Sequence, residues 1–320
     1  MKRLLKTREA GIAGILLVIL IFVTLQSPQF LTANNILNVL NNNVVLGIMA
    51  LGMTVVIITG GIDVSVGSML AAIAVVIGNF LFLPIANPFT VLIVALVTGL
   101  LLGLFNGFFV AKFKIPAIIV TLGTLSIYRG VNLEVTRGTW ISGLPDWFLQ
   151  FSRGSLLGVP IPIYVFIAAI LFTYGMLKYT KMGRWIYAYG GDAESAQRIG
   201  IQPEKVQLFV YSYMGLMTGL AALLHSAQLG NIQPTAAVGF ELTVIAAVVI
   251  GGTNILGGIG SVSGTVFGVL LLAFMQNGLV LARISSFWQD VFIGAIIVVA
   301  VTFDVVREKR RERAKAILQA

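Results

Sequence analysis

Few side chains in this sequence of 320 residues could carry out chemistry. It contains no cysteine and a single histidine, His225, so a thiolate nucleophile, a disulfide framework and a cysteine or histidine-cluster metal site are excluded. The glycine-rich segment 251–258 resembles a phosphate-binding loop only in its glycines, because it lacks the lysine that would reach the phosphates of ATP. No convergent set of acid, base or metal ligands is visible. We therefore predict a protein that is not an enzyme, needs no cofactor and cannot hydrolyse ATP alone.

The bulk composition indicates a membrane protein. Apolar residues make up 58% of the sequence and charged residues 10%, and the mean hydropathy is +0.98. A soluble domain carries roughly 25% charged and 45–50% apolar residues. The shortage of charge is too large for a water-facing fold. We predict an all-α polytopic membrane protein that forms a single domain over residues 1–320.

Long apolar runs predict about ten transmembrane helices, because a backbone in lipid needs about 20 residues of internally hydrogen-bonded helix to cross. The first run could also be a cleaved signal peptide, but the residues that follow it offer no small-x-small cleavage site, so we expect a retained helix. The predicted spans are 10–26, 44–60, 66–84, 88–111, 115–134, 160–178, 206–229, 241–257, 262–282 and 287–306.

Basic residues give these helices an orientation. Most of the 21 lysines and arginines fall in four clusters, each beside an apolar run: residues 2–8, 112–114, 178–205 and the tail 307–320. With the N-terminus inside, an even number of crossings returns every cluster to the cytoplasm, as the positive-inside rule requires. A nucleic-acid surface assembled from four separate loops is the less consistent explanation of the net charge of +9. We predict that both termini are cytoplasmic and that the protein binds no nucleic acid.

A polar segment interrupts the apolar pattern after residue 58. Gly60 and Gly61 can end one helix there, and Asp63 or Ser65 can cap the next by accepting hydrogen bonds from its free N–H groups. The alternative is a site that lines a pathway, since ionisable residues at membrane depth usually face an aqueous cavity. The predicted position of Asp63 near the cytoplasmic end favours capping.

The longest polar loop, 178–205, predicts a short surface helix. Asp192 is suited to begin it, Glu194 to its first turn and Gly200 to a left-handed stop, with Ile201 folding back on Ala196. A helix of two turns is unstable alone in water, so either the bundle or a partner protein must hold it. The remaining alternative is a solvated charged loop.

Several polar side chains lie inside the later spans, and Arg129 is the most costly of them to bury. It can pair with Glu134 or with outside water, or extend toward the membrane surface. No run of Asp, Glu and His suitable for a proton relay is present. That absence argues against an ion-coupled pump, although sodium coupling can rely on backbone carbonyls alone.

Four segments carry a family resemblance: 50–54, the Gly-Gly-Ile-Asp-Val-Ser-Val-Gly-Ser stretch at 60–68, 184–201, and 251–258. Together they resemble the sugar permeases of bacterial ATP-binding-cassette importers, of which the ribose permease subunit is the best-known type. Asp192 departs from the family pattern, where an asparagine is expected, but both residues cap helices. Segments 121–130 and 138–145 look similar to rhamnose-type or autoinducer-2-type permeases.

The resemblance implies a multi-pass permease of the bacterial inner membrane, working with partners. These are a second permease copy or paralogue, cytoplasmic ATP-binding subunits and an extracytoplasmic sugar-binding protein. The loop 178–205 would contact the ATP-binding subunit through Gly190, Gly191, Asp192, Ala193, Glu194, Ala196 and Gly200. The alternative function is an ion-coupled secondary sugar transporter, which neighbouring ATPase and binding-protein genes would argue against.

A sugar pathway needs scattered hydrogen-bonding groups rather than a tight charged site. We therefore expect Asn106, Tyr128, Asn254 and Asn277 to border the pathway at the dimer or bundle axis.

Overall fold

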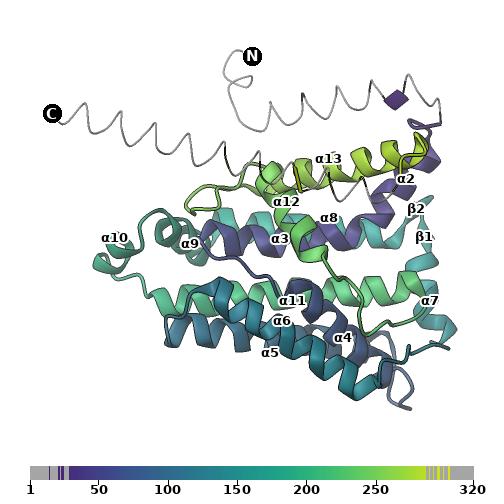
Figure 1. Cartoon of the computed structure of the whole chain (residues 1–320), viewed down its shortest axis with the longest axis horizontal. Coiled ribbons are helices and arrows are strands. Elements are labelled where there is room, and N and C mark those ends of the chain that lie inside the picture. The colour runs from purple at the N-terminus through teal and green to yellow at the C-terminus, as the bar shows by residue number, and fades with distance from the viewer. Residues whose placement is uncertain are drawn as a thin grey trace.

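The computed structural model describes residues 29–285 without a break, and a few isolated positions on either side. Most of this part is helical, and one two-stranded hairpin and several irregular connections make up the rest (Figure 1). Five of its helices are long and apolar enough to cross a membrane, or six if the bent pair α2 and α3 counts as one span. The predicted spans 10–26 and 287–306, the basic cluster 2–8 and the tail 307–320 lie outside the continuously described residues.

The elements in chain order are α2 (Ala33–Asn42), α3 (Val44–Ile58), α4 (Val66–Phe80), α5 (Pro88–Lys112), α6 (Ala117–Thr136), α7 (Asp146–Arg153), β1 (Ser155–Leu156), β2 (Val159–Pro160), α8 (Ile161–Tyr179), α9 (Lys181–Gly191), α10 (Ala193–Arg198), α11 (Pro203–Leu229), α12 (Phe240–Ile250) and α13 (Val262–Leu281). The strands pair antiparallel, with Ser155 opposite Pro160. Helices therefore occur in all eight predicted apolar runs that the continuous part covers.

The centre of the bundle is α3, in which all 15 residues are buried. A helix that is apolar on every side belongs in a core rather than on a surface. Beside it, α5 and α11 pack closely through glycines, because a Cβ atom at Gly99 or Gly103 would overlap backbone atoms of Gly215 or Tyr211. Gly99, Gly103 and Gly107, which recur every four residues on α5, thus form a small-residue helix interface with α11.

Two helices differ from the full spans that the sequence predicts. Helix α4 has 15 residues and α12 has 11, about 22 and 16 Å at 1.5 Å per residue, whereas a bilayer core is about 30 Å thick. Irregular segments, 59–65 and 230–239, lead into them from opposite ends of the bundle, and both helices begin inside it (Figure 1). The predictions of spans 66–84 and 241–257 were wrong in extent, because hydropathy reports composition and not depth.

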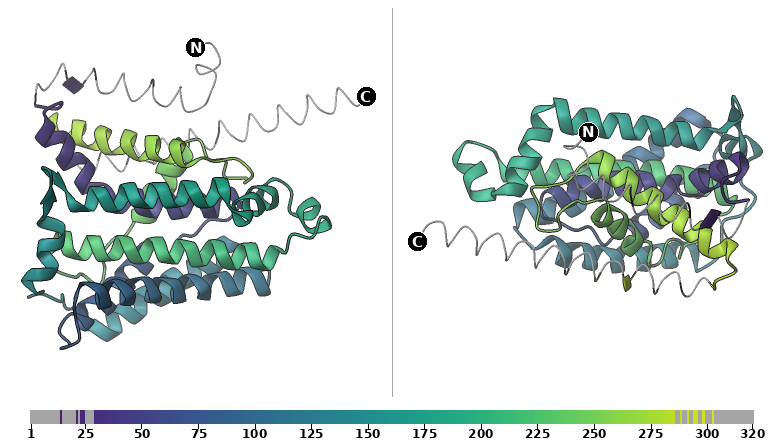
Figure 2. Two further views of the ribbon diagram at one scale, coloured as in Figure 1. Left: turned by 180° about the vertical axis from the view of Figure 1, so that it is seen from behind. Right: turned by 90° about the horizontal axis from the view of Figure 1, so that it is seen from above.

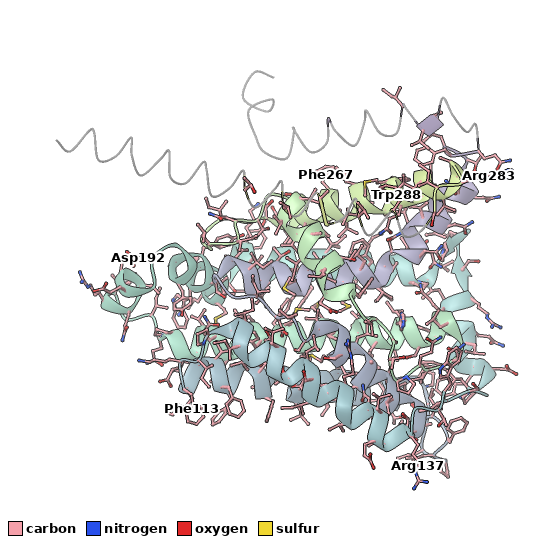
Figure 3. The ribbon with its side chains drawn as sticks, in the orientation of Figure 1. Phe113, Arg137, Asp192, Phe267, Arg283 and Trp288 are labelled. Atoms are coloured by element: carbon pink, nitrogen blue, oxygen red, sulfur yellow. The ribbon has the colours of Figure 1, made fainter. Side chains whose placement is uncertain are left out.

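Smaller elements cover the two ends of the bundle. Helices α9 and α10 project at one end, and α7 with the hairpin lies at the other, as the views from behind and from above show (Figure 2). Figure 3 places Asp192 and Phe113 at the first end and Arg137 at the opposite one. The continuously described part thus has two distinct polar ends, separated by apolar helices.

Candidate functional site

The three glycine-rich motifs meet at the end of the bundle that carries α9 and α10. The backbone N–H of Gly258 donates to the carbonyl of Ile58 at 2.8 Å. Gly190, on α9, lies against the same carbonyl so closely that a Cβ atom there would overlap it. A Cβ atom at Gly257 would lie 2.7 Å from the carbonyl oxygen of Gly190. We call this contact of α3, α9 and the α12–α13 loop the glycine junction.

A tyrosine strengthens the glycine junction. The Tyr187 hydroxyl, one turn before Gly190 on α9, donates to the carbonyl of Gly260 at 2.8 Å. Gly60 lies at the same place, where a Cβ atom would be 3.5 Å from the carbonyl oxygen of Leu256. Backbone packed against backbone leaves little freedom for one segment to shift without the others. A displacement of α9 must therefore also displace the end of α3 and the loop that follows α12.

Helix α10 has the ends that its sequence predicts. The Asp192 carboxylate accepts from the N–H groups of Glu194 at 3.0 Å and Ser195 at 3.1 Å, and from the Ser195 hydroxyl at 2.7 Å. These hydrogen bonds, those of Ser195 first, lower the pKa of the Asp192 carboxyl below its ordinary value. At the other end Gly200 has a φ of +89°, and the Ile201 N–H donates to the Ala196 carbonyl at 3.1 Å.

The surface of α10 is divided between a buried and an outward side. Ala196 is buried against the bundle, and Ala193 and Glu194 are exposed. Ile199, at the end of α10, leaves 77% of its surface exposed. The bundle thus holds this short helix in place, and α10 presents an apolar side chain at its tip. Gly191 is also exposed, and a Cβ atom there would meet nothing within 4 Å.

A cavity of about 530 Å³ adjoins α9 and α10. Its walls come from the end of α3, the turn between α5 and α6, and the start of α11. Lys114 lines it from that turn, and Glu194, Glu204 and Gln207 line it from α10 and α11. The side-chain oxygen of Gln207 is buried without a hydrogen-bond partner among the described residues. We interpreted Lys112 and Lys114 only as orienting charges, so the contribution of this turn was missed.

The Asp63 segment forms a buried hydrogen-bond network beside the glycine junction. Asp63 is fully buried and accepts from the N–H and hydroxyl of Ser65 at 2.9 and 2.6 Å. The Asn106 amide donates to Ser65 at 2.8 Å and to Asp63 at 3.3 Å, while Tyr128 donates to Asn106 at 3.3 Å. Asp63 therefore organises the start of α4 and links it to α5 and α6.

The four residues expected along a pathway lie in separate surroundings. Asn106 is 0% exposed and Tyr128 is bonded to it. Asn254 shapes the loop after α12 by accepting from the Leu256 N–H at 3.0 Å. Asn277, on α13, exchanges amide hydrogen bonds with Asn35 at 2.9 and 3.2 Å. Each has a hydrogen bond within the bundle, and a pathway role for any of them stays a prediction.

Arg129 does not pair with Glu134, one of the partners considered for it. Five positions separate them on α6, which places them about 140° apart around the helix. Glu134 is exposed, whereas one terminal nitrogen of Arg129 is buried with no hydrogen-bond partner in the described part of the chain. That part also contains no group of three or more His, Cys, Asp or Glu residues suited to a metal ion.

The described chain is a bundle with five or six apolar helices long enough to cross a membrane, and the helix pair α9 and α10 is anchored at one end. The chain belongs to the family described as branched-chain amino acid transport system / permease component, whose model matches residues 35–301.

Curated relatives support the same membership. The chain is 40% identical to the ribose import permease protein RbsC of Escherichia coli K12 over 293 residues, 90% of this chain and 91% of that protein. It is 39% identical to RbsC of Bacillus subtilis 168 over 291 residues, 90% of each chain. It is 38% identical to the autoinducer 2 import system permease protein LsrC of Escherichia coli K12/DH10B over 299 residues, 92% of this chain and 86% of that one. No solved structure matches the chain.

Proposed function

We propose that this chain is the membrane-spanning subunit of an ATP-binding-cassette importer, and that it moves a monosaccharide or sugar-like compound into the cell. The anchoring of α9 and α10 to the bundle is the observation that carries the proposal. A partner protein that binds these two helices could displace them as a unit and so move the bundle. Relatives named as ribose and autoinducer-2 import permeases support the substrate class.

The proposal assigns an orientation and partners. Ten crossings would place both termini, the turn 113–116 and α9–α10 in the cytoplasm, as the basic clusters favour. Two permease copies or paralogues, each a single domain, would then sit on two ATP-binding subunits in the bacterial inner membrane. A sugar-binding protein would deliver substrate at the opposite end, where α7 and the hairpin lie.

The glycine junction suggests how ATP energy would reach the substrate path. An ATP-binding subunit that receives Ile199 and the cavity beside α10 would move α9 when its own halves close. Because Gly190 and Gly257 hold α9 against α3 and the α12–α13 loop, that movement would pass to the interrupted helices α4 and α12. Bistable packing of this kind turns a small shift at one end into a rearrangement at the other.

Reconstitution tests this function. The permease, the ATP-binding subunit and the binding protein encoded beside it would be placed in proteoliposomes, with the sugar chosen by a thermal-shift screen of that binding protein. Uptake should require ATP on the side of the membrane where the ATP-binding subunits lie. It should stop when the ATP-binding subunit is omitted. Uptake that persists without it and follows a sodium or proton gradient would instead establish a secondary transporter.

A further inference from the structure

A second pocket lies at the end of the bundle remote from α10, beside the start of α12. It measures about 360 Å³, within the usual range for small-molecule sites. Its lining includes Asn42 on α2, Leu70 on α4, His225 and Gln228 on α11, Ala237, and Phe240 on α12. We call it the His225 pocket. Asn42 is exposed, so the pocket has an opening at this end.

The pocket contains a buried polar atom that the bundle does not satisfy. The Nε2 atom of His225 is buried and has no hydrogen-bond partner in the described chain. Gln228 follows three positions later on the same helix face and donates to the Asn41 carbonyl at 3.0 Å. Unpaired buried polar atoms are costly and need a reason, of which a ligand is one.

The lining favours a neutral ligand rich in hydroxyl groups. Imidazole and carboxamide groups both donate and accept hydrogen bonds, as a sugar hydroxyl requires. Phe240 adds an apolar surface for the C–H face of a sugar ring, and no lysine, arginine or carboxylate lines the pocket. The carboxyl group of Glu241, buried one residue away on α12, would oppose an anionic ligand.

The position of the His225 pocket beside the start of α12 also favours a ligand site. Helix α12 begins inside the bundle, after the irregular segment 230–239. Non-helical backbone at membrane depth is tolerated where it is buried in protein or lines a cavity, and transporters use such interrupted helices for substrate sites. A Cβ atom at Gly67 would lie 2.5 Å from the Ala237 carbonyl, so this segment also contacts the start of α4.

Resting on the proposed function, we infer that the His225 pocket is a sugar-binding site within the permease. His225 and Gln228 contact hydroxyl groups, Phe240 packs on the ring, and Asn42 lies at the mouth of the pocket. The site accepts the sugar at the extracytoplasmic end, beside the helix whose other end lies next to the glycine junction. Its modest number of polar groups suits a site that must release its ligand.

The natural absence of cysteine allows a direct test on the permease alone. Asn42→Cys places one thiol at the mouth of the pocket, and Leu157→Cys places one at the hairpin tip on the same side, where 92% of the residue is exposed. Maleimide labelling of each variant in nanodiscs is timed with D-ribose, with D-glucose, with L-rhamnose and with any sugar the reconstituted importer carries. Dextran, a polymer too large for a site of about 360 Å³, controls for viscosity.

We expect at least one monosaccharide to slow labelling of Asn42→Cys severalfold and to leave Leu157→Cys unchanged. Adding His225→Leu or Gln228→Met should abolish this protection, and adding His225→Gln, which keeps a hydrogen-bonding group, should retain part of it. Size-exclusion chromatography checks that each variant is folded. Because His225→Leu and Gln228→Met are separate variants, one misfolded protein leaves the test intact.

Absence of protection by every sugar overturns the site, as does protection that survives both His225→Leu and Gln228→Met. Failure here with intact ATP-driven uptake leaves the proposed function standing. Protection without ATP-driven uptake supports the pocket and contradicts the importer. The two hypotheses are thus separated by their own readouts.

Discussion

The two ends of the bundle are built in opposite ways. At the glycine junction, backbone contacts backbone, and a single added methyl group at Gly190 has no room. At the His225 pocket, a cavity of about 360 Å³ is bordered by the buried Nε2 atom of His225, which has no hydrogen-bond partner among the described residues. Close packing transmits displacement, whereas a polar cavity can hold and release a ligand. The comparison assigns the input of energy to one end and the handling of substrate to the other.

The largest expected effect comes from filling the glycine junction. Gly190→Ala would drive a methyl group into the Ile58 carbonyl and force backbone to move, a change that typically costs 1–3 kcal/mol or more. ATP-driven uptake should fall to background. The matched control is Gly175→Ala on α8, since a Cβ atom there meets nothing within 4 Å. Equal uptake by the two variants would show that the junction transmits nothing.

Breaking the end of α10 should have the next largest effect. Gly200→Val places a β-branched residue at a φ of +89°, at a cost on the order of 1–2 kcal/mol or more. The permease should insert normally but retain less ATP-binding subunit on co-purification. Gly200→Asn, which tolerates this conformation better, should retain more. Full retention and transport by Gly200→Val would reduce the loop to a linker.

The α10 cap should show a smaller, pH-dependent effect. Hydrogen bonds lower the pKa of Asp192 in the folded protein, so its stabilising contribution is complete above the ordinary carboxyl value, about 4, and is lost as pH falls through the lowered value. Near neutral pH the Asp192 carboxylate stays ionised, so binding of the ATP-binding subunit should not vary with pH there on account of this group. Asp192→Ala should weaken binding there, and Asp192→Asn should preserve it. Equal binding of the ATP-binding subunit by Asp192→Ala and Asp192→Asn would show that the helix cap does not contribute to binding.

The Asn106 network should affect stability more than transport selectivity. Asn106→Leu removes donors from Asp63 and Ser65 and leaves buried acceptors unpaired, which costs about 1–3 kcal/mol. The thermal unfolding midpoint in detergent should fall, with little change in which sugars are carried. Asn277→Leu, which breaks a partly buried amide pair, should lower it less. A changed sugar preference in Asn106→Leu would show that Asn106 borders the sugar pathway.

The smallest expected effect concerns Arg129. Its buried nitrogen has no partner among the described residues, so Arg129→Met removes an unsatisfied group and keeps much of the side-chain volume. The amount of folded permease, measured by fluorescence-detected chromatography, should stay the same or rise slightly. Glu134→Gln should change nothing. A large loss of folded protein in the first variant would show that Arg129 has an essential partner.

Local signals were predictable from the sequence, and spatial relations were not. The caps of α10 follow from residue types at fixed spacing, so Asp192 and Gly200 were assigned their places correctly. The short helices α4 and α12 were missed, because their apolar composition is that of full spans. Glu134 was considered as a partner for Arg129 because both lie in the same predicted span. The helical period of 3.6 residues places their side chains on different sides of α6.

The two sites needed the fold itself. Segments 60–67, 190–192 and 251–258 were each singled out, but nothing in their spacing shows that they touch. His225 was noted only as a solitary histidine, and its missing partner appears only once α2, α11 and α12 are packed together. The i, i+3 spacing of His225 and Gln228 was the one available hint.

Cross-linking through Ile199 tests the central claim most directly. Ile199→Cys and Leu157→Cys each introduce a single thiol, one at each end of the bundle. A thiol-to-amine cross-linker is applied to the permease assembled with its ATP-binding subunit in nanodiscs. The account predicts that Ile199→Cys captures the ATP-binding subunit and that Leu157→Cys does not. Capture through Leu157→Cys, or through neither residue in an assembly that hydrolyses ATP and transports sugar, would contradict it.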